Sequence, residues 1–215
     1  YKNIYEKNPK KNIYTNSIIM KKIPEYLESP IDNFLYVLIE KVAPSFHKLG
    51  FSPNMITSLG NVATIFSVYA LYKHQFLISS LFFILSYMFD CLDGYVARTY
   101  NLVTEFGDYY DHISDATKIT VVCFMLYRIN PSLFLATLPL LIIMGTLMCS
   151  YLAYQEKFYG NSEASYTLSL FDSLCFASGD KRELIHHMSY TRYFGCGTFI
   201  AIMSIIITLY YPSKK

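Results

Sequence analysis

The sequence predicts an all-α membrane protein, in which a polytopic bundle of five to six transmembrane helices follows an amphipathic helix lying in the membrane interface. Composition is the first observation behind this prediction, because 53% of the residues are hydrophobic and only 16% are charged. The second is the distribution of charge, which collects at the chain ends and in one late loop. The apolar runs between these regions are long enough to cross a hydrocarbon core about 30 Å thick.

The same composition excludes several classes of protein. A net charge of +2 is too small to indicate a nucleic-acid partner, and the aromatic residues lack the basic interleaving of a base-stacking surface. The cysteines form neither a Cys-x-x-Cys pair nor a cluster with histidine, so we expect no disulfide framework and no zinc site. We interpret all five as small packing residues: Cys91, Cys123, Cys149, Cys175 and Cys196.

The N-terminal region divides into a polar segment and a helix. Residues 1–30 are rich in Lys and Asn and are expected to be irregular; because the chain starts at Tyr1, we also expect a trimmed initiator segment. The membrane domain is predicted over residues 31–215 and opens with the interfacial helix, residues 31–48. The apolar side of that helix is formed by Ile31, Phe34, Leu35, Leu38 and Val42, and its polar side by Asp32, Asn33, Glu40 and Lys41.

The transmembrane bundle is predicted over residues 54–211. Ser52 and Pro53 suit the N-cap and the first turn of its first helix. The expected helices cover residues 54–71, 76–98, 105–127, 131–154 and 194–211. Charged residues interrupt any span over 155–193, so either a short or broken further helix lies there or the chain departs from a six-helix pattern.

Two predicted helices carry pairs of acids where a membrane protein should have few. At helical pitch Asp90 and Asp93 share one face, and Asp111 and Asp115 share a face of the next helix. One ionised Asp deep in a bilayer costs about 2.5 to 3.5 kcal/mol, so four would cost roughly 10 kcal/mol without an offsetting charge. Solvated acids at helix ends are the alternative for a single Asp, but four at this spacing favour a divalent-cation site.

Small residues and one basic residue accompany the acids. Gly94, Ala97 and Gly107 lie on the same faces and remove side-chain bulk, which lets a ligand approach the backbone closely. Arg98 follows within the same helix and offers a planar fork of donors for phosphate. Together these residue types predict a site for a metal ion and a phosphate-bearing ligand.

These residues carry a family resemblance. Asp90-x₂-Asp93-Gly94-x₂-Ala97-Arg98-x₈-Gly107-x₃-Asp111-x₃-Asp115 fills every fixed position of the motif of the CDP-alcohol phosphotransferases, which are integral membrane enzymes of phospholipid synthesis. Pro53-Asn54-x-x-Thr57 also resembles the start of the first transmembrane helix in that family. The resemblance covers about the middle third of the chain.

The resemblance implies roles for individual residues. Two Mg²⁺ or Mn²⁺ ions would be held by Asp90, Asp93, Asp111 and Asp115, and Asp115 would also be the general base. The nucleotide would be lined by Asn54, Thr57, Asp90, Gly94, Ala97, Arg98 and Gly107. A plain Asp with a pKa near 4 is a weak base, so this dual role requires neighbours that tune its pKa. The resemblance also implies a homodimer.

The expected reaction moves a substituted phosphate from a CDP-alcohol to the hydroxyl of an acceptor alcohol and releases CMP. Chain length favours CDP-diacylglycerol as the donor with a small polar acceptor such as inositol, glycerol phosphate or serine. One alternative is a choline/ethanolamine-type enzyme with diacylglycerol as acceptor, for which the Asp111-His112 pair is weak support. A divalent-cation transporter is the alternative from another class, but it would need polar groups through both halves of the bilayer.

The remaining polar residues have simpler interpretations. Asp108 and His112 are expected to point away from the acid face, and His186-His187 is interpreted as loop surface rather than a metal site. Counting Lys and Arg near the helix ends predicts that the acid motif faces the cytoplasm.

Overall fold

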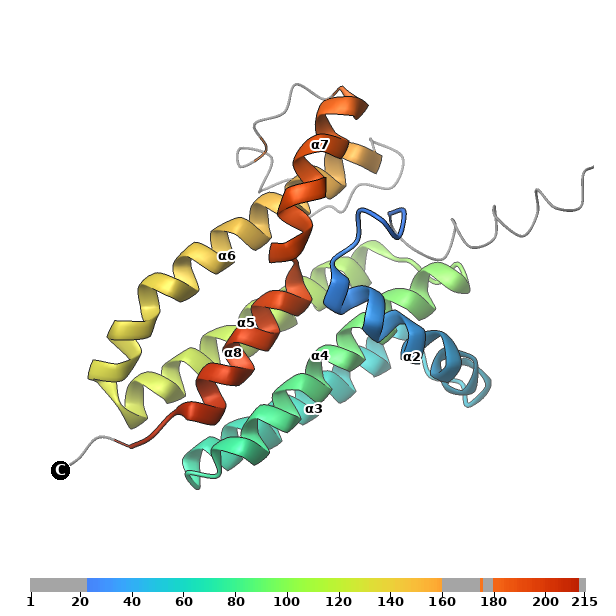
Figure 1. Ribbon diagram of the computed structural model, residues 1–215. Helices are drawn as coiled ribbons and strands as arrows, with labels where there is room; N and C mark the ends of the chain where they lie inside the picture. Colours follow the sequence, from blue (N-terminus) through green and yellow to red (C-terminus); the bar gives the residue numbers. More distant parts are fainter. Residues whose placement is uncertain (1–22, 160–174, 176–179, 213–215) are drawn as a thin grey trace, which may run out of the picture.

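Helices make up every regular element in the part of the chain that this computed structural model describes, residues 23–159, 175 and 180–212 (Figure 1). They are α2 (Pro30–Lys48), α3 (Pro53–Tyr72), α4 (Phe76–Thr99), α5 (Glu105–Ile129), α6 (Pro131–Tyr159), α7 (Lys181–Thr191), the short 3₁₀ helix η2 (Arg192–Phe194) and α8 (Cys196–Leu209). The all-α prediction is therefore confirmed. The predicted irregular segment lies mostly outside the described residues, and so does most of the stretch between α6 and α7.

The predicted helix limits agree closely with the observed ones. The hydroxyl of Ser52 accepts a hydrogen bond from the backbone N–H of Met55 at 3.3 Å, so α3 begins with the predicted cap and proline. The largest difference is at α6, which continues to Tyr159 rather than ending at 154. The added residues include Gln155 and Glu156, whose polar side chains are buried against neighbouring segments instead of facing lipid.

The region that the sequence left open contains a broken helix. Helix α7 is polar and short, and its first turn is capped by the carboxylate of Asp180, which accepts from the N–H of Arg182 at 3.4 Å. It leads through η2 directly into α8, so Lys181–Leu209 forms one nearly continuous helical segment (Figure 1). His186 and His187 therefore lie on a helix, which corrects the loop predicted for them; the ring of His187 stacks on Tyr154.

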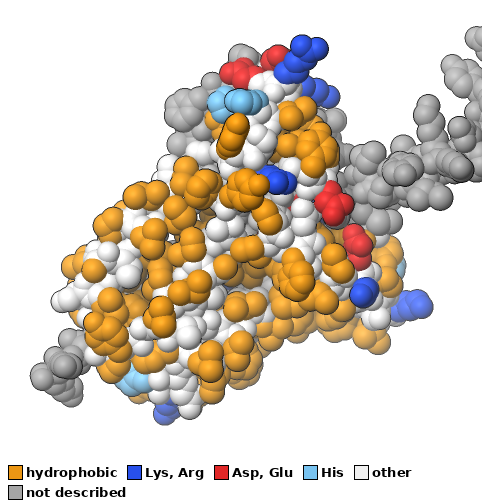
Figure 2. All heavy atoms as spheres, viewed as in Figure 1, with side chains coloured by type: hydrophobic (Ala, Val, Ile, Leu, Met, Phe, Trp, Pro, Cys, Tyr) orange, Lys and Arg blue, Asp and Glu red, His pale blue; other side chains and the backbone are white. Residues whose placement is uncertain are grey.

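Within the described part of the chain, four helical segments are long and apolar enough to cross a membrane, judged by length and composition. They are α3, α4, residues 131–158 of α6, and the α7–α8 segment. Hydrophobic side chains cover most of the face formed by α6 and α8, while charged side chains gather around α7 and α2 (Figure 2). These features are those of an integral membrane protein. Helix α5 is not among these segments, because acidic residues in its first half make it too polar. A fifth membrane span therefore stays a prediction.

Helix α2 presents an apolar stripe away from the bundle. Phe34, Leu38 and Val42 are exposed, as expected for a helix that lies against lipid. Ile39 and Ala43 are instead buried against α3 and α4. The assignment of Asp32 to the solvated side was wrong, because this residue is only 6% exposed and points into the bundle. Helical periodicity could not reveal this, since the burying groups come from α4 and α8.

Small residues allow α3 and α4 to pack closely along their lengths. Gly60 lies against the backbone of α4, where an added Cβ would be 3.2 Å from the carbonyl oxygen of Ser86. The hydroxyls of Thr64 and Ser86 lie 2.8 Å apart, and those of Ser67 and Ser79 lie 2.9 Å apart. Such contacts hold membrane helices together where the lipid provides no hydrophobic driving force. They also fix α3 beside the end of α4 that carries Asp90 and Asp93.

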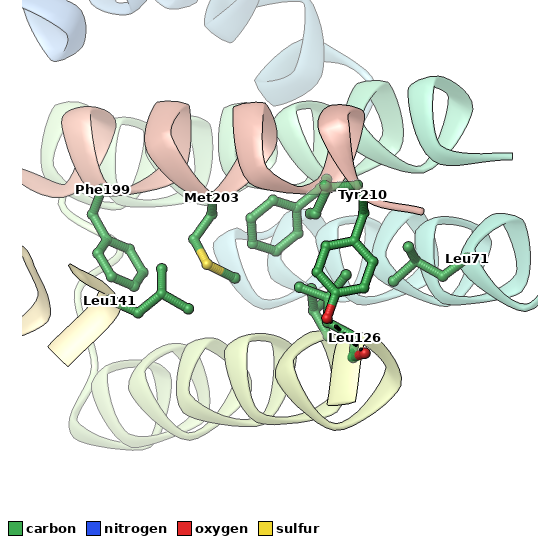
Figure 3. Close-up of a cluster of buried hydrophobic side chains, with 9 residues drawn as sticks. Leu71, Leu126, Leu141, Phe199, Met203 and Tyr210 are labelled. Carbon is green, nitrogen blue, oxygen red and sulfur yellow. Dashed lines mark hydrogen bonds between the residues drawn. The ribbon is translucent and has the colours of Figure 1, made fainter. Parts of the chain in front are cut away.

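The opposite end of the bundle is held by an apolar cluster (Figure 3). Leu71, Leu126, Phe199 and Met203 bring together α3, α5 and α8. The hydroxyl of Tyr210 lies 2.9 Å from the carbonyl oxygens of Leu126 and Asn130, which satisfies its polar group within this cluster. The bundle thus has an apolar end. Its other end, where the C-terminal half of α4 meets the N-terminal half of α5, is acidic.

Gly197 is a close-packing point between α8 and α2, and we predict that Gly197→Ala destabilises the fold. An added Cβ would overlap Asp32 Oδ1 and lie 2.8 Å from Ile31 Cγ2. Overpacking of this kind costs about 1–3 kcal/mol, measurable as a lower thermal midpoint in detergent.

Gly145→Ala is the matched control. Its added Cβ would have no contact closer than 3.8 Å, to a ring atom of Phe199, so the midpoint should stay within error of wild type. Equal midpoints for the two variants would contradict the packing assigned to Gly197.

Candidate metal centre

The acids of α4 and α5 converge where these two helices meet. One carboxylate oxygen each from Asp90, Asp111 and Asp115 lies within 4.8 Å of the others. The turn between the helices is short, and α5 begins with a cap in which the Thr104 hydroxyl accepts from the N–H of Gly107 at 3.0 Å. The helical spacing of the motif therefore brings three of its four acids together across the two helices.

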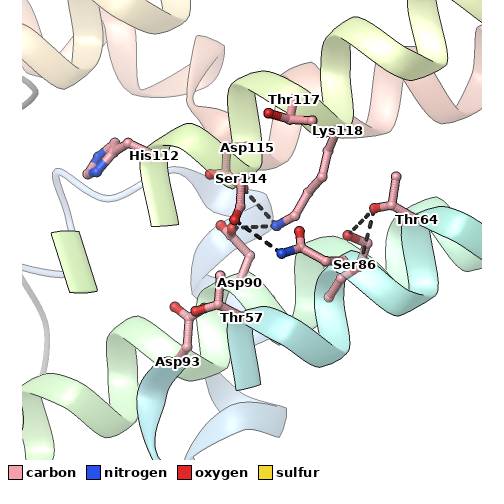
Figure 4. A network of polar contacts seen from close by, with 12 residues as sticks. Thr57, Thr64, Ser86, Asp90, Asp93, His112, Ser114, Asp115, Thr117 and Lys118 are labelled. Atoms are coloured by element: carbon pink, nitrogen blue, oxygen red, sulfur yellow. Dashed lines mark hydrogen bonds and ion pairs between the residues drawn. The ribbon is translucent and has the colours of Figure 1, made fainter. Parts of the chain in front are cut away.

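Asp93 lies beside this group of three but does not belong to it. Its Oδ2 accepts a hydrogen bond from the hydroxyl of Thr57 at 2.5 Å, and both residues are buried (Figure 4). The structure thus brings Thr57 of α3 directly to the acid motif. The role of Asp93 as a metal ligand stays a prediction.

Lys118 is a charged residue of this site that sequence reasoning missed. Its Nζ lies 2.8 Å from Asp115 Oδ1 and 3.3 Å from Asp90 Oδ1, so its ammonium joins the two helices (Figure 4). Its side chain is only 8% exposed. A signal was available, because Lys118 follows Asp115 by three residues and charged groups within membrane helices are functional candidates.

Polar contacts also hold α5 against α3 beside the acids. The hydroxyls of Ser58 and Tyr110 lie 2.9 Å apart, and the amide of Asn61 donates to Ser114 at 3.1 Å. These bonds fix the rotation of α5, which decides the direction in which Asp111 and Asp115 point.

Asp111 provides the test of whether the site suits a cation. Its Oδ1 is fully buried and has no hydrogen-bond partner among the described residues. A buried carboxylate oxygen without a partner is costly unless a cation or donor approaches it. Three clustered carboxylates of the type that Mg²⁺ and Mn²⁺ prefer, with one oxygen left over, fit a divalent ion.

The residues predicted for the nucleotide lie around the same helix ends. Arg98 folds back over α4, where an added Cβ on Gly94 would be 3.0 Å from its Nη1, so glycine makes room for the guanidinium. An added Cβ on Gly107 would be 3.1 Å from Asn54 Oδ1, which places α3 and α5 in contact at this point. Ala97 is partly exposed one turn beyond Asp93.

A cavity of about 160 Å³ adjoins the acids, and Asp90, Asp111, Gly94 and Arg98 form part of its wall. The cavity is also lined by acidic and aromatic side chains that sequence reasoning did not connect with the site: Glu28, Asp32, Tyr36, Tyr87 and Tyr151. Burial raises the pKa of both Glu28 and Asp32 above its usual value. No single segment could have revealed this wall, because its residues come from the turn before α2 and from α2, α4 and α6.

Asp108 and His112 lie beside the site and form a pair of their own. His112 Nδ1 lies 2.8 Å from the carbonyl oxygen of Asp108. Figure 4 shows the His112 ring pointing away from the acids, as predicted from its helical position.

Comparison with known proteins places the site within a matched region. A family model described as CDP-alcohol phosphatidyltransferase matches residues 51–210. An uncharacterized protein of Aquifex aeolicus is 30% identical over 110 residues, 49% of this chain and 52% of the relative. A CDP-diacylglycerol–glycerol-3-phosphate 3-phosphatidyltransferase of Rickettsia felis is 45% identical over 51 residues, 24% of this chain and 28% of the relative.

An archaetidylinositol phosphate synthase of Pyrococcus horikoshii is 26% identical over 86 residues, 40% of this chain and 46% of the relative. The chain therefore spans about half the length, or less, of the curated relatives that it matches. No solved structure is significantly similar to it.

We predict that Lys118→Met destabilises the protein in the absence of added metal. Removing one partner of a fully buried ion pair costs about 3–5 kcal/mol, and roughly 1–3 kcal/mol is expected here because Asp115 is partly exposed. Thermal unfolding in detergent with a chelator measures the loss.

Added Mn²⁺ should raise the midpoint of Lys118→Met more than that of wild type, since the variant leaves more carboxylate charge uncompensated. Lys118→Arg keeps the charge and is the matched control. A Lys118→Met protein as stable as wild type without metal would refute the charge role of Lys118.

Proposed function

This chain belongs to the CDP-alcohol phosphatidyltransferase family, and we propose that it transfers a substituted phosphate group from a CDP-alcohol to the hydroxyl of an acceptor alcohol, with release of CMP. One observation carries the proposal. The acids of the family motif meet across α4 and α5 at the polar end of an apolar bundle, with a buried oxygen of Asp111 left unpartnered. Such a site suits the binding of a charged diphosphate at a membrane surface.

The metal site would be formed by Asp90, Asp111 and Asp115, with Asp93 adjacent. Mg²⁺ or Mn²⁺ fits this set of oxygen ligands, and we propose two ions. When bound, the ions would neutralise charge on the diphosphate and so favour attack at phosphorus. Lys118 supports the same charge balance from the membrane side, since its ammonium contacts Asp90 and Asp115.

Asp115 is proposed as the general base that accepts the proton of the attacking hydroxyl. Its side chain is 38% exposed, which leaves its carboxylate open to an acceptor. The contact with Lys118 at 2.8 Å holds the carboxylate in place.

The donor nucleotide would lie between the ends of α3, α4 and α5. Asn54, Thr57 and Gly107 come together there, and Arg98 offers donors to the diphosphate. Gly94 and Ala97 have little or no side chain, so this side of α4 leaves room for the nucleotide. We further propose CDP-diacylglycerol as donor, membrane lipid as the surroundings, a cytoplasmic orientation of the site and a homodimer.

A divalent-cation transporter is supported less well. Transport would require polar groups along the whole bundle, whereas the end opposite the acids is filled by the apolar cluster around Leu126, Phe199 and Met203. A choline/ethanolamine-type reaction, with diacylglycerol as the acceptor, is the second candidate within the same chemistry.

Asp115→Asn is predicted to lower CMP release by about 10²- to 10⁴-fold, because the amide cannot accept the proton of the acceptor hydroxyl. The assay uses purified protein with CDP-diacylglycerol or CDP-choline, a panel of acceptors and Mg²⁺. Asp108→Asn, on the same helix but paired with His112, is the matched control and should keep turnover within a few-fold of wild type. Full turnover by Asp115→Asn would refute the assigned base.

Metal removal is predicted to abolish CMP release, and Mg²⁺ or Mn²⁺ should restore it. Direct binding of Mn²⁺, followed by electron paramagnetic resonance, should weaken roughly tenfold or more in Asp111→Asn. Glu105→Gln, at the exposed start of α5, serves as the control with unchanged affinity. Unaltered Mn²⁺ binding in Asp111→Asn would exclude Asp111 from the metal site.

A further inference from the structure

The cavity beside the acid motif has one wall that the proposed reaction does not yet use. Asp90 and Asp111 belong to both the metal site and the cavity, so a molecule bound in the cavity would lie next to the reacting groups. The wall in question includes Glu28, from the turn before α2, and Asp32, from α2.

These two carboxylates are buried, and among the described residues no basic side chain lies within ion-pair distance of either. Glu28 is 5% exposed, and its Oε1 accepts hydrogen bonds from the Ser29 N–H and the Tyr151 hydroxyl, each at 3.1 Å. Asp32 is 6% exposed, and its Oδ1 accepts from the Tyr87 hydroxyl at 2.6 Å. Within the described residues neither forms an ion pair within 4.0 Å. Hydrogen bonds thus satisfy part of each carboxylate, but no direct ion pair with a described residue offsets its charge.

Among the described residues that line the cavity, Arg98 is the only one with a basic side chain. Its Nη2 reaches the Tyr36 hydroxyl at 3.4 Å, and its Nε is buried without a partner. Under the proposed function this guanidinium faces the donor diphosphate. A phosphate-bearing acceptor would therefore meet the carboxylates of Glu28 and Asp32 without a second basic side chain among the described lining residues, and repulsion between like charges disfavours its binding.

Aromatic rings complete the wall. Tyr36, Tyr87 and Tyr151 all line the cavity beside the two acids. The faces of tyrosine rings attract cations, and rings combined with carboxylates recognise organic ammonium groups. A neutral polyol could use the same hydroxyls, but it would leave the charge of Glu28 and Asp32 unbalanced.

We propose that this cavity binds the ammonium group of an amino alcohol, held by Glu28 and Asp32 among the three tyrosine rings. The inference rests on the proposed function for its place in the reaction. The amino alcohol reaches the cavity either as the free acceptor or as the head group of the CDP-alcohol donor, since both carry the same ammonium chemistry.

Binding without turnover is the first test. Choline and ethanolamine are titrated into the full chain in detergent by calorimetry, with inositol and glycerol 3-phosphate as comparison probes. The ammonium probes should bind at least tenfold more tightly than the other two, and Asp32→Asn should weaken choline binding tenfold or more. Glu40→Gln, an exposed acid on the same helix, should leave it unchanged.

Glu28→Gln provides a second variant on a different segment, for the case in which Asp32→Asn does not fold. Its thermal midpoint is measured beside its affinity, so that loss of binding is separated from loss of structure. Equal affinity for choline in wild type and a folded Glu28→Gln would overturn the proposal.

Activity then distinguishes the two sources of the amino alcohol. One arm supplies CDP-diacylglycerol with ethanolamine or serine, and the other supplies CDP-ethanolamine or CDP-choline with diacylglycerol. CMP release in either arm supports the inference and identifies the source. If CMP is released only when glycerol 3-phosphate or inositol is the acceptor, and in neither of these two arms, the inference is overturned while the transferase function stands. Ammonium binding without CMP release from any pair would overturn the transferase function instead.

Discussion

Acidic side chains outnumber their basic partners at one end of the apolar bundle. Asp90, Asp93, Asp111 and Asp115 gather there, and the ammonium of Lys118 forms ion pairs with two of them, Asp90 and Asp115. Buried charges are tolerated when they are paired or coordinate metals, and the unpartnered oxygen of Asp111 marks the place where pairing is incomplete. The site is thus partly neutralised by the protein itself and leaves charge for a ligand to complete.

The rest of the bundle keeps these acids in register. Small residues let α3 approach α4 closely, which brings Thr57 to Asp93, and the contacts of Ser58 and Asn61 with α5 set its rotation. The apolar cluster at the opposite end fixes the far ends of α3, α5 and α8. Rigid helices held at both ends can position carboxylates more accurately than a loop could.

Helix α2 links the membrane surface to the site. Its exposed stripe of Phe34, Leu38 and Val42 suits contact with lipid, while Asp32 on the other side reaches the cavity beside the acids. If the exposed stripe contacts lipid, as we propose, this helix would lie between the lipid and the candidate site. Its packing against Gly197 of α8 also holds Asp32 at the cavity that Arg98 lines.

Local patterns in the sequence determined the helices and the acid motif. Hydrophobic runs, the Ser52-Pro53 start and the spacing of the four Asp residues depend only on neighbours along the chain, so helix limits and shared faces follow from periodicity. Only the tertiary structure decided that Lys118 joins Asp90 to Asp115, that Asp32 is buried, and that Glu28 and Tyr151 form a wall of the cavity. The physical reason is that burial and charge pairing arise from contacts between segments distant in sequence, and no periodicity records which helix faces another.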